Sequence, residues 1–163
     1  MKQLINGKDW GHSKYLAYLD KNGNYQHLIN KTTGVFAICI TQDEKVVLMG
    51  NEPLGGHIEN SETVEDTLKR EALEEGGIQL DKWKYFGYYE ITLSDEADQK
   101  YKDKYPKVGY ILFFLARGHK VMEPYGKDVT SVQILDKEYL INSGKFQHEM
   151  LLEGLKLYPD YLI

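Results

Sequence analysis

The chain has 163 residues, a length that suits one domain (residues 1–163) with a hydrophobic core of its own. Its formal net charge of −5 argues against a protein that binds the backbone of nucleic acids broadly. The single cysteine, Cys39, excludes a disulfide framework within the chain, and it lies in an apolar run where burial is expected. No signal-like segment and no run of membrane-spanning length is found, so we expect a cytoplasmic protein.

The first third of the chain predicts strands. The segments Tyr15–Leu19 and Tyr25–Ile29 flank the dipeptide Asn22-Gly23, which is a strong signal for a hairpin over residues 15–30. Two further strands are expected at Gly34–Thr41 and Lys45–Met49, joined by a short polar turn. A hairpin that precedes the core in this way could mediate a homodimer.

An acidic helix is expected next, over Glu62–Glu75. Ser61 is a candidate N-cap, and Gly76-Gly77 supplies a stop at the other end. At about 100° per residue, Val64, Leu68 and Ala72 fall on one stripe of this helix. The same stripe continues into carboxylates at Glu71 and Glu75, with Glu74 beside it.

The second half of the chain predicts strands followed by helices. A charged segment, Ser94–Lys107, separates the first two strands. The expected elements are strands at Trp83–Leu93, Val108–Ala116 and Ser131–Leu135, a short helix at Lys137–Ile141 and a final helix at Phe146–Tyr158. Strands with helices before and after them favour an α/β protein in which helices cover both faces of a sheet.

The three carboxylates Glu71, Glu74 and Glu75 lie within five residues. Carboxylates this close repel one another, and partial burial raises the cost of keeping them ionised. One interpretation is a solvated acidic face on an ordinary helix. The other is a site for a hard divalent cation with oxygen ligands, and Mg²⁺ is the usual choice beside phosphates.

The residues around this cluster favour the cation site. They resemble the Nudix box, G-x5-E-x7-R-E-U-x-E-E-x-G-U, where U is a bulky apolar residue, over residues 56–78. The positions that match in one register are Gly56, Glu62, Arg70, Glu71, Glu74, Glu75, Gly77 and Ile78. Ala72 is smaller than the usual occupant of its position. The resemblance implies the Nudix fold, an α/β/α sandwich around a mixed β-sheet.

The resemblance also implies a reaction: hydrolysis of a diphosphate linkage in a nucleoside diphosphate joined to another group, X. It implies Mg²⁺, or alternatively Mn²⁺, held by Glu71, Glu74, Glu75 and the backbone carbonyl of Gly56. The implied supporting residues are Gly55, which lets the loop turn sharply, Glu62 and Arg70 as a structural pair, and Gly77. The expected partner is therefore a small nucleoside diphosphate derivative.

The general base is open at this point. Glu123 and Asp128 lie in a turn-rich loop after a predicted strand, and Asp128 resembles the position of a family acid that completes the metal site. Asp128 could equally be an ordinary loop acid. A carboxylate of the box, Glu74 or Glu75, could instead act as the base.

Candidate substrate contacts are His57 and Glu59 in the box, and Tyr101 and Tyr105 in the charged segment. The two tyrosines are accompanied by lysines, so the segment could form a nucleotide lid, or it could be an ordinary solvated loop. His57 could touch phosphate or simply face solvent. The tyrosines elsewhere favour strands and the core.

The identity of X is not readable from the spacing. A proline near Thr92 or a tyrosine near Leu93–Asp95 would mark two known subfamilies, and neither is present. The alternative to an enzyme is a Nudix-fold module that binds or senses a nucleotide without cleaving it. Such modules tend to lose box carboxylates or to carry a DNA-binding module, for which this chain has no spare length.

Overall fold

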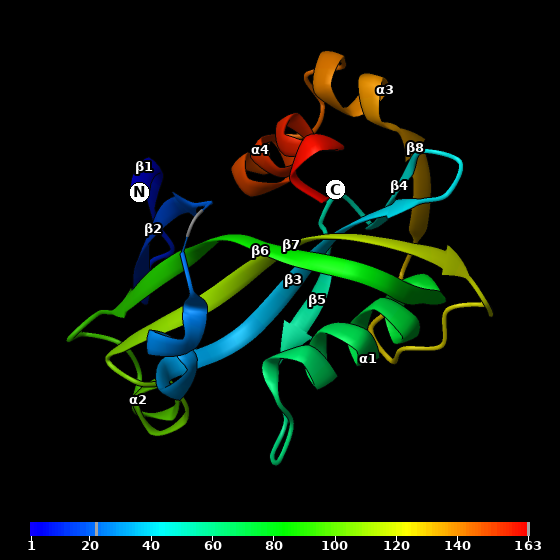
Figure 1. The fold of residues 1–163 in the computed structure, drawn as a ribbon. Coiled ribbons are helices and arrows are strands. Elements are labelled where there is room, and N and C mark those ends of the chain that lie inside the picture. The colour runs from blue at the N-terminus through cyan, green and yellow to red at the C-terminus, as the bar shows by residue number, and fades with distance from the viewer. Residues whose placement is uncertain (22, 163) are drawn as a thin grey trace.

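The computed structural model describes residues 1–21 and 23–162, and within them the chain forms an eight-stranded mixed sheet (Figure 1). The strands run in the order β1-β2-β6-β7-β3-β4-β8, and β5 pairs with β3 off this path. The central neighbours β3 and β7 are parallel, and the other pairs are antiparallel. The strands are β1 Lys2–Asp9, β2 Ser13–Asp20, β3 Thr32–Thr41, β4 Lys45–Met49, β5 Leu54–His57, β6 Ile78–Leu93, β7 Val108–Lys120 and β8 Val132–Asp136.

Helices cover both faces of this sheet. Figure 1 shows α1 on one side and α3 and α4 on the other, with α2 near the end where β6 leads into β7. The helices are α1 Val64–Gly76, α2 Gln99–Lys104, α3 Lys137–Asn142 and α4 Glu149–Leu157, with 3₁₀ turns η1 Tyr25–His27, η2 Ile29–Lys31 and η3 Asp160–Leu162. The expected α/β/α layering is therefore confirmed.

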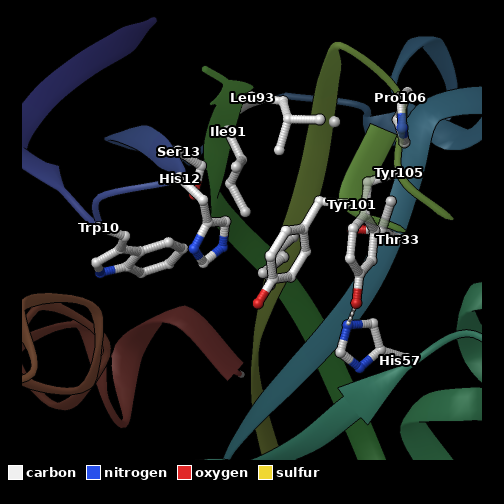
Figure 2. Close-up of a pocket in the computed structure, with 12 residues that line it drawn as sticks. Trp10, His12, Ser13, Thr33, His57, Ile91, Leu93, Tyr101, Tyr105 and Pro106 are labelled. Carbon is white, nitrogen blue, oxygen red and sulfur yellow. Dashed lines mark hydrogen bonds between the residues drawn. The ribbon is translucent and has the colours of Figure 1, made fainter. Parts of the chain in front are cut away.

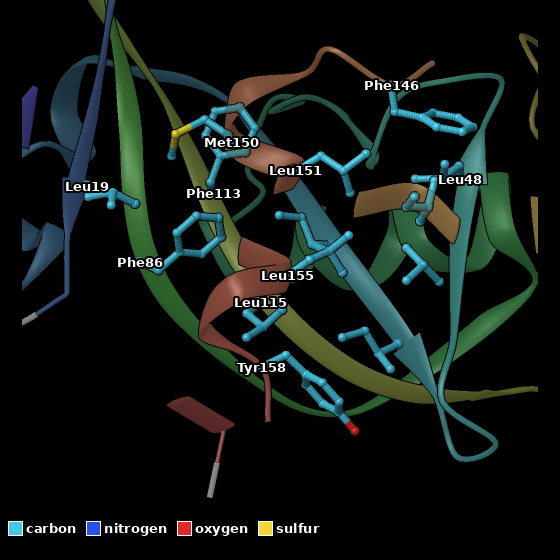
Figure 3. Packing of buried hydrophobic residues seen from close by; sticks show 14 of the residues in the cluster. Leu19, Leu48, Phe86, Phe113, Leu115, Phe146, Met150, Leu151, Leu155 and Tyr158 are labelled. Carbon is cyan, nitrogen blue, oxygen red and sulfur yellow. The ribbon is translucent and has the colours of Figure 1, made fainter. Parts of the chain in front are cut away.

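Alternation along β3 explains the two layers. Side chains of successive strand residues point to opposite faces, so Ile38 and Ile40 join one core while Val35 and Ala37 join the other. Figure 3 shows the first core, where α4 lays its apolar side over the large β-strand side chains. The buried residues of this layer include Phe86, Phe113, Leu115, Met150, Leu151 and Leu155. Because both faces are covered, β3 reads as a nearly continuous apolar run.

Helix α1 packs its predicted stripe against the opposite face: Val64, Leu68 and Ala72 are all buried. The predicted N-cap, Ser61, is wrong. Thr63 caps the helix: its Oγ accepts from the amide of Asp66 at 3.1 Å, and the Asp66 carboxylate accepts from the amide of Thr63 at 3.1 Å. At the other end Gly77 adopts φ = 66°, the left-handed conformation that commonly ends a helix.

The N-terminal strands differ from the prediction. A hairpin does precede the core, but its strands are β1 and β2, joined through Trp10–His12. The predicted strand Tyr25–Ile29 is wrong: this stretch forms the turns η1 and η2, because the side chain of Asn24 accepts a hydrogen bond from the amide of Gln26 at 2.9 Å. The Asn22-Gly23 turn lies partly outside the described residues, since Asn22 is not among them.

The later elements are those expected, with shifted ends. Strand β6 begins at Ile78, five residues before the predicted start, and β7 continues to Lys120. The charged segment after β6 contains the short helix α2, and Leu54–His57 forms the strand β5, which was not expected. Cys39 is fully buried, as its apolar surroundings predict. None of the helices in residues 1–21 and 23–162 combines the length and apolar character needed to cross a membrane.

Candidate functional site

Two glycines let β5 approach both the sheet and the end of α1. A Cβ atom at Gly55 would lie 2.1 Å from the carbonyl oxygen of Val35, so only glycine fits against β3 at this point. The amide of Gly55 donates to Oε2 of Glu75 at 2.9 Å. A Cβ atom at Gly56 would lie 2.3 Å from Oε1 of Glu71, which places that carboxylate directly against the strand backbone.

Arg70 links the loop before α1 to the carboxylates on α1. Its Nε and Nη2 donate to the two oxygens of Glu62 at 2.6 and 3.0 Å, and Nη2 also donates to the carbonyl of His57 at 3.1 Å. Its Nη1 donates to Glu71 at 2.9 Å and to Glu74 at 3.2 Å. The bidentate bond to Arg70 lowers the pKa of Glu62 to about 2.

Two carboxylates of α1 are harder to ionise than an exposed glutamate. Burial raises the pKa of Glu75 to about 7, and the charges of Glu71 and Asp128 act in the same direction. Burial likewise raises the pKa of Glu71, although Arg70 opposes the shift. One guanidinium therefore does not neutralise this group of acids, and a divalent cation would lower the free energy of their ionised forms.

The carboxylates of Glu71, Glu74 and Glu75 line one cavity of about 700 Å³, together with the loop of Asp128. The lining residues are Phe36, Gly55, Gly56, His57, Glu59, Arg70, Glu71, Glu74, Glu75, Tyr125, Gly126, Lys127 and Asp128. The amides of Tyr125 and Gly126 donate to the carbonyl of Glu74 at 2.9 and 3.0 Å, which docks the loop of Asp128 onto the end of α1. Glu123 does not line this cavity; it is exposed and pairs with Lys120 at 2.7 Å.

The donor set at this cavity fits a hard cation. Among the described residues no three acidic, histidine or cysteine side chains are already grouped as metal ligands. The carboxylates of Glu71 and Glu74 accept hydrogen bonds from Arg70, and that of Glu75 accepts one from the amide of Gly55. The available ligands are carboxylate oxygens and the carbonyl of Gly56, which are the atoms that Mg²⁺ and Mn²⁺ prefer. Rotation of the glutamate side chains would release these oxygens for a metal.

A second cavity, of about 250 Å³, adjoins the first and shares His57 with it (Figure 2). The phenol of Tyr105 is hydrogen-bonded to Nε2 of His57 at 3.0 Å. The rings of His12 and Tyr101 stack with centroids 4.3 Å apart and planes 4° apart. The two tyrosines of the charged segment thus line this aromatic cavity rather than the acidic one. Trp10 and His12 also line it, and no pattern in the sequence links them to the box.

The lysines of the charged segment lie outside both cavities. Lys102 donates to the carbonyl of Asp95 at 2.6 Å, and Lys107 pairs with the carboxylate of Asp95. Nζ of Lys100 lies 4.9 Å from the ring centroid of Tyr101, and Nζ of Lys104 lies 5.1 Å from that of Tyr105, so the segment combines cations with aromatic rings. A nucleotide lid over the metal site stays a prediction.

The family model of the NUDIX domain matches residues 30–151, which is most of the chain. The chain belongs to the NUDIX domain family. The predicted family, fold class and enzyme class, a Nudix hydrolase, are thereby confirmed. The matched segment contains β3, α1 and the loop of Asp128, whereas the hairpin of β1 and β2 lies before it.

Solved structures of Nudix proteins share the fold. A mutant of the Bacillus subtilis pyrophosphohydrolase BsRppH aligns with a TM-score of 0.64 and 22% identity over 98% of this chain and 95% of that one. A MutT structure, from work on Aliivibrio salmonicida and Vibrio cholerae, aligns with a TM-score of 0.53 and 17% identity over 78% of this chain and 98% of that one. A NUDIX hydrolase from Clostridium perfringens aligns with a TM-score of 0.51 and 22% identity over 80% of this chain and 99% of that one. No curated protein matches the chain.

Proposed function

We propose that this Nudix protein hydrolyses a diphosphate linkage in a nucleoside diphosphate derivative, with Mg²⁺ as its cofactor. The observation that carries the proposal is the single cavity lined by Glu71, Glu74, Glu75, Gly56 and Asp128. An acidic cavity would repel a diphosphate unless cations were bound between them, so a metal and the substrate are expected to bind together. The name of one structural neighbour, a pyrophosphohydrolase, agrees with this reaction.

The residues of the chain divide the work in the following way. Glu71, Glu74 and Glu75, with the carbonyl of Gly56, would hold the metal. When bound, the metal would neutralise phosphate charge and would lower the pKa of a water ligand. Arg70, anchored by Glu62, fixes the positions of the carboxylates of Glu71 and Glu74.

A carboxylate also has to accept the proton of the attacking water. Asp128 is exposed at the rim of the cavity, and its charge contributes to the raised pKa of Glu75. Asp128 lines the same cavity as the box carboxylates and is proposed as the base, and Glu74 and Glu75 are the alternatives on α1. The proton acceptor needs to reach a water at the phosphorus, and the Asp128 side chain is exposed at this cavity.

Hydrolysis by the purified protein tests the proposal. The substrates to compare are nucleoside di- and triphosphates, nucleotide sugars, dinucleotides and RNA with capped or triphosphorylated ends, each with Mg²⁺, Mn²⁺ or a chelator. We expect metal-dependent turnover of at least one of them, lowered about 100-fold or more by Glu75→Gln. Glu65→Gln, in the first turn of the same helix, is the matched control and should retain full activity.

Two results would contradict the proposal. Full activity of Glu75→Gln would show that the reaction does not depend on this cavity. Binding of nucleotides without turnover of any substrate would instead favour a nucleotide-binding or sensor module.

We propose further that the protein is cytoplasmic. A cytoplasmic location agrees with the one cysteine, Cys39, which is a free thiol buried in the core, and with the supply of nucleotides in that compartment. A homodimer could form along β1, the strand at one end of the sheet order. Size-exclusion chromatography with light scattering measures the oligomeric state, and a monomer at all concentrations would exclude the homodimer.

A further inference from the structure

Arg70 is one of two cationic side chains that line the acidic cavity, and its hydrogen-bonding capacity is already used. A guanidinium group has five N–H donors. In Arg70 two of them donate to Glu62 and one donates to the carbonyl of His57. The remaining two donate to Glu71 and Glu74. A phosphate oxygen could therefore bind this guanidinium only by displacing a carboxylate or the carbonyl.

Lys127 is the other cation that lines this cavity, and its side chain is exposed. Within residues 1–21 and 23–162 its ammonium group forms no salt bridge, whereas Lys120, seven residues earlier, pairs with Glu123 at 2.7 Å. An ammonium group has three donors and no acceptor. Lys127 therefore offers the cavity a positive charge that the box does not consume.

The backbone around Lys127 is anchored to the helix of the box. The amides of Tyr125 and Gly126 donate to the carbonyl of Glu74, and the amide of Val129 donates to the carbonyl of Gly126 at 3.2 Å. The second of these contacts closes a turn around Lys127 and Asp128. The position of the Lys127 backbone is thus fixed beside the carboxylates, while its ammonium group is left for a ligand.

The charge of the substrate decides what this ammonium group can bind. A diphosphate that is esterified at both ends carries one negative charge on each phosphorus. A terminal phosphate carries an additional charge near neutral pH, because its second pKa is about 6. A cation held by several carboxylates has little positive charge left for that additional negative charge. A lysine acts on phosphate as a point charge and does not need the planar geometry of an arginine.

We propose that Lys127 binds a terminal, unesterified phosphate of the substrate, so that X is a phosphate group with a free end rather than a sugar or a second nucleoside. The inference rests on the proposed hydrolysis at the acidic cavity. Its preferred substrates are nucleoside di- and triphosphates. Lys127 is a residue of substrate selection, because its contact with the phosphate is present before and during the attack of water.

Steady-state kinetics on matched substrates tests this selection. A nucleoside triphosphate and a nucleotide sugar with the same base share the nucleoside and differ in the free phosphate. Lys127→Met removes the charge and keeps most of the side chain. We expect kcat/KM to fall about 3- to 10-fold more for the triphosphate than for the sugar, chiefly through KM. Lys127→Arg should restore most of the preference, and Lys120→Met, outside the cavity, should leave it unchanged.

Binding of methylenediphosphonate tests the contact without hydrolysis. This probe has two free phosphonate ends, and its P–C–P linkage resists cleavage. Isothermal titration calorimetry in Mg²⁺ should give an affinity about 3- to 10-fold lower for Lys127→Met than for the native protein at low salt. The difference should shrink at about 0.5 M salt, because screening weakens an exposed ion pair. A purely structural role of Lys127 would not produce this dependence on salt.

The outcomes separate this inference from the proposed function. Turnover with the same substrate preference in Lys127→Met and the native protein, or turnover of nucleotide sugars and dinucleotides alone, would overturn the role of Lys127 and leave the hydrolase proposal standing. Salt-dependent binding of methylenediphosphonate that Lys127→Met weakens, with no turnover of any substrate, would support the phosphate contact and overturn the hydrolase proposal.

Discussion

Replacing Glu62 with Gln probes the ion pair that ties the loop before α1 to the helix. The substitution keeps the shape of the side chain and removes its charge. In the protein the Glu62 carboxylate accepts both bonds from Arg70, at 2.6 and 3.0 Å, as well as bonds from Thr67 at 2.8 Å and from the amide of Glu59 at 3.0 Å. We expect the variant to fold and to be less stable at neutral pH.

The size of the loss follows from the pKa of Glu62. Arg70 and the other donors lower this pKa from its ordinary value of 4.5 to about 2, which corresponds to about 3 kcal/mol at neutral pH. The Glu62 side chain is 19% exposed, so solvent screening reduces the expected loss of stability to ~1–2 kcal/mol. Because the folded-state pKa is the lower one, this stabilisation is complete above pH 4.5 and is lost as the pH falls toward 2.

Urea unfolding followed by tryptophan fluorescence measures the difference in the free energy of unfolding between the native protein and Glu62→Gln at several pH values. This gap in stability should be ~1–2 kcal/mol at neutral pH and should shrink between about pH 4.5 and about pH 3. Glu59→Gln, an exposed change in the same loop, is the control and should differ little from the native protein at any pH. A gap that is absent at neutral pH, or that does not change with pH, would refute the role assigned to the pair.

Three other substitutions test the site and the core. Asp128→Asn should lower kcat if Asp128 accepts the proton, and an unchanged pH–rate profile would return that role to Glu74 or Glu75. Gly56→Ala should push the Glu71 carboxylate away from β5, because the new Cβ would lie 2.3 Å from its Oε1. Hydrolysis should fall about 10- to 100-fold while thermal stability changes little, and full activity would contradict this. Gly154→Ala should lower the free energy of unfolding by ~1–2 kcal/mol despite the better helix propensity of alanine, because its Cβ would lie 2.3 Å from Cδ1 of Ile38. A variant that is more stable in urea unfolding would show that the Ile38 side chain moves aside at little cost.

The sequence predicts the helix of the box well because several independent signals agree there. Val64, Leu68 and Ala72 repeat at helical spacing, and Gly77 ends the helix where a left-handed residue is required. The start is placed too early because Ser61 and Thr63 are both good caps by residue type. Only the reciprocal bonds between Thr63 and Asp66 decide between them, and those depend on the backbone conformation.

Other parts are hidden from the sequence for physical reasons. Strand β1 is mostly exposed, so it lacks the alternation of apolar residues that marks a strand, and its pairing with β2 defines it instead. The acidic cavity can largely be predicted from the sequence because most of its carboxylates come from one helix. The aromatic cavity cannot, since Trp10, His57 and Tyr101 are brought together only by the pairing of β2 with β6 and by the hydrogen bond between His57 and Tyr105, the residue after α2.

The parallel pairing of β3 with β7 has a consequence for synthesis on the ribosome. Phe36 pairs with Phe113, so at ~5–20 residues per second the nascent chain carries β3 for roughly 4 to 15 s before its partner is made. During that interval one edge of β3 is bare, and Ile38 and Ile40 await the still later helix α4. We expect translation stalled before β7 to leave this strand open to protease and to chaperones that bind apolar segments, and release of the finished chain to close it.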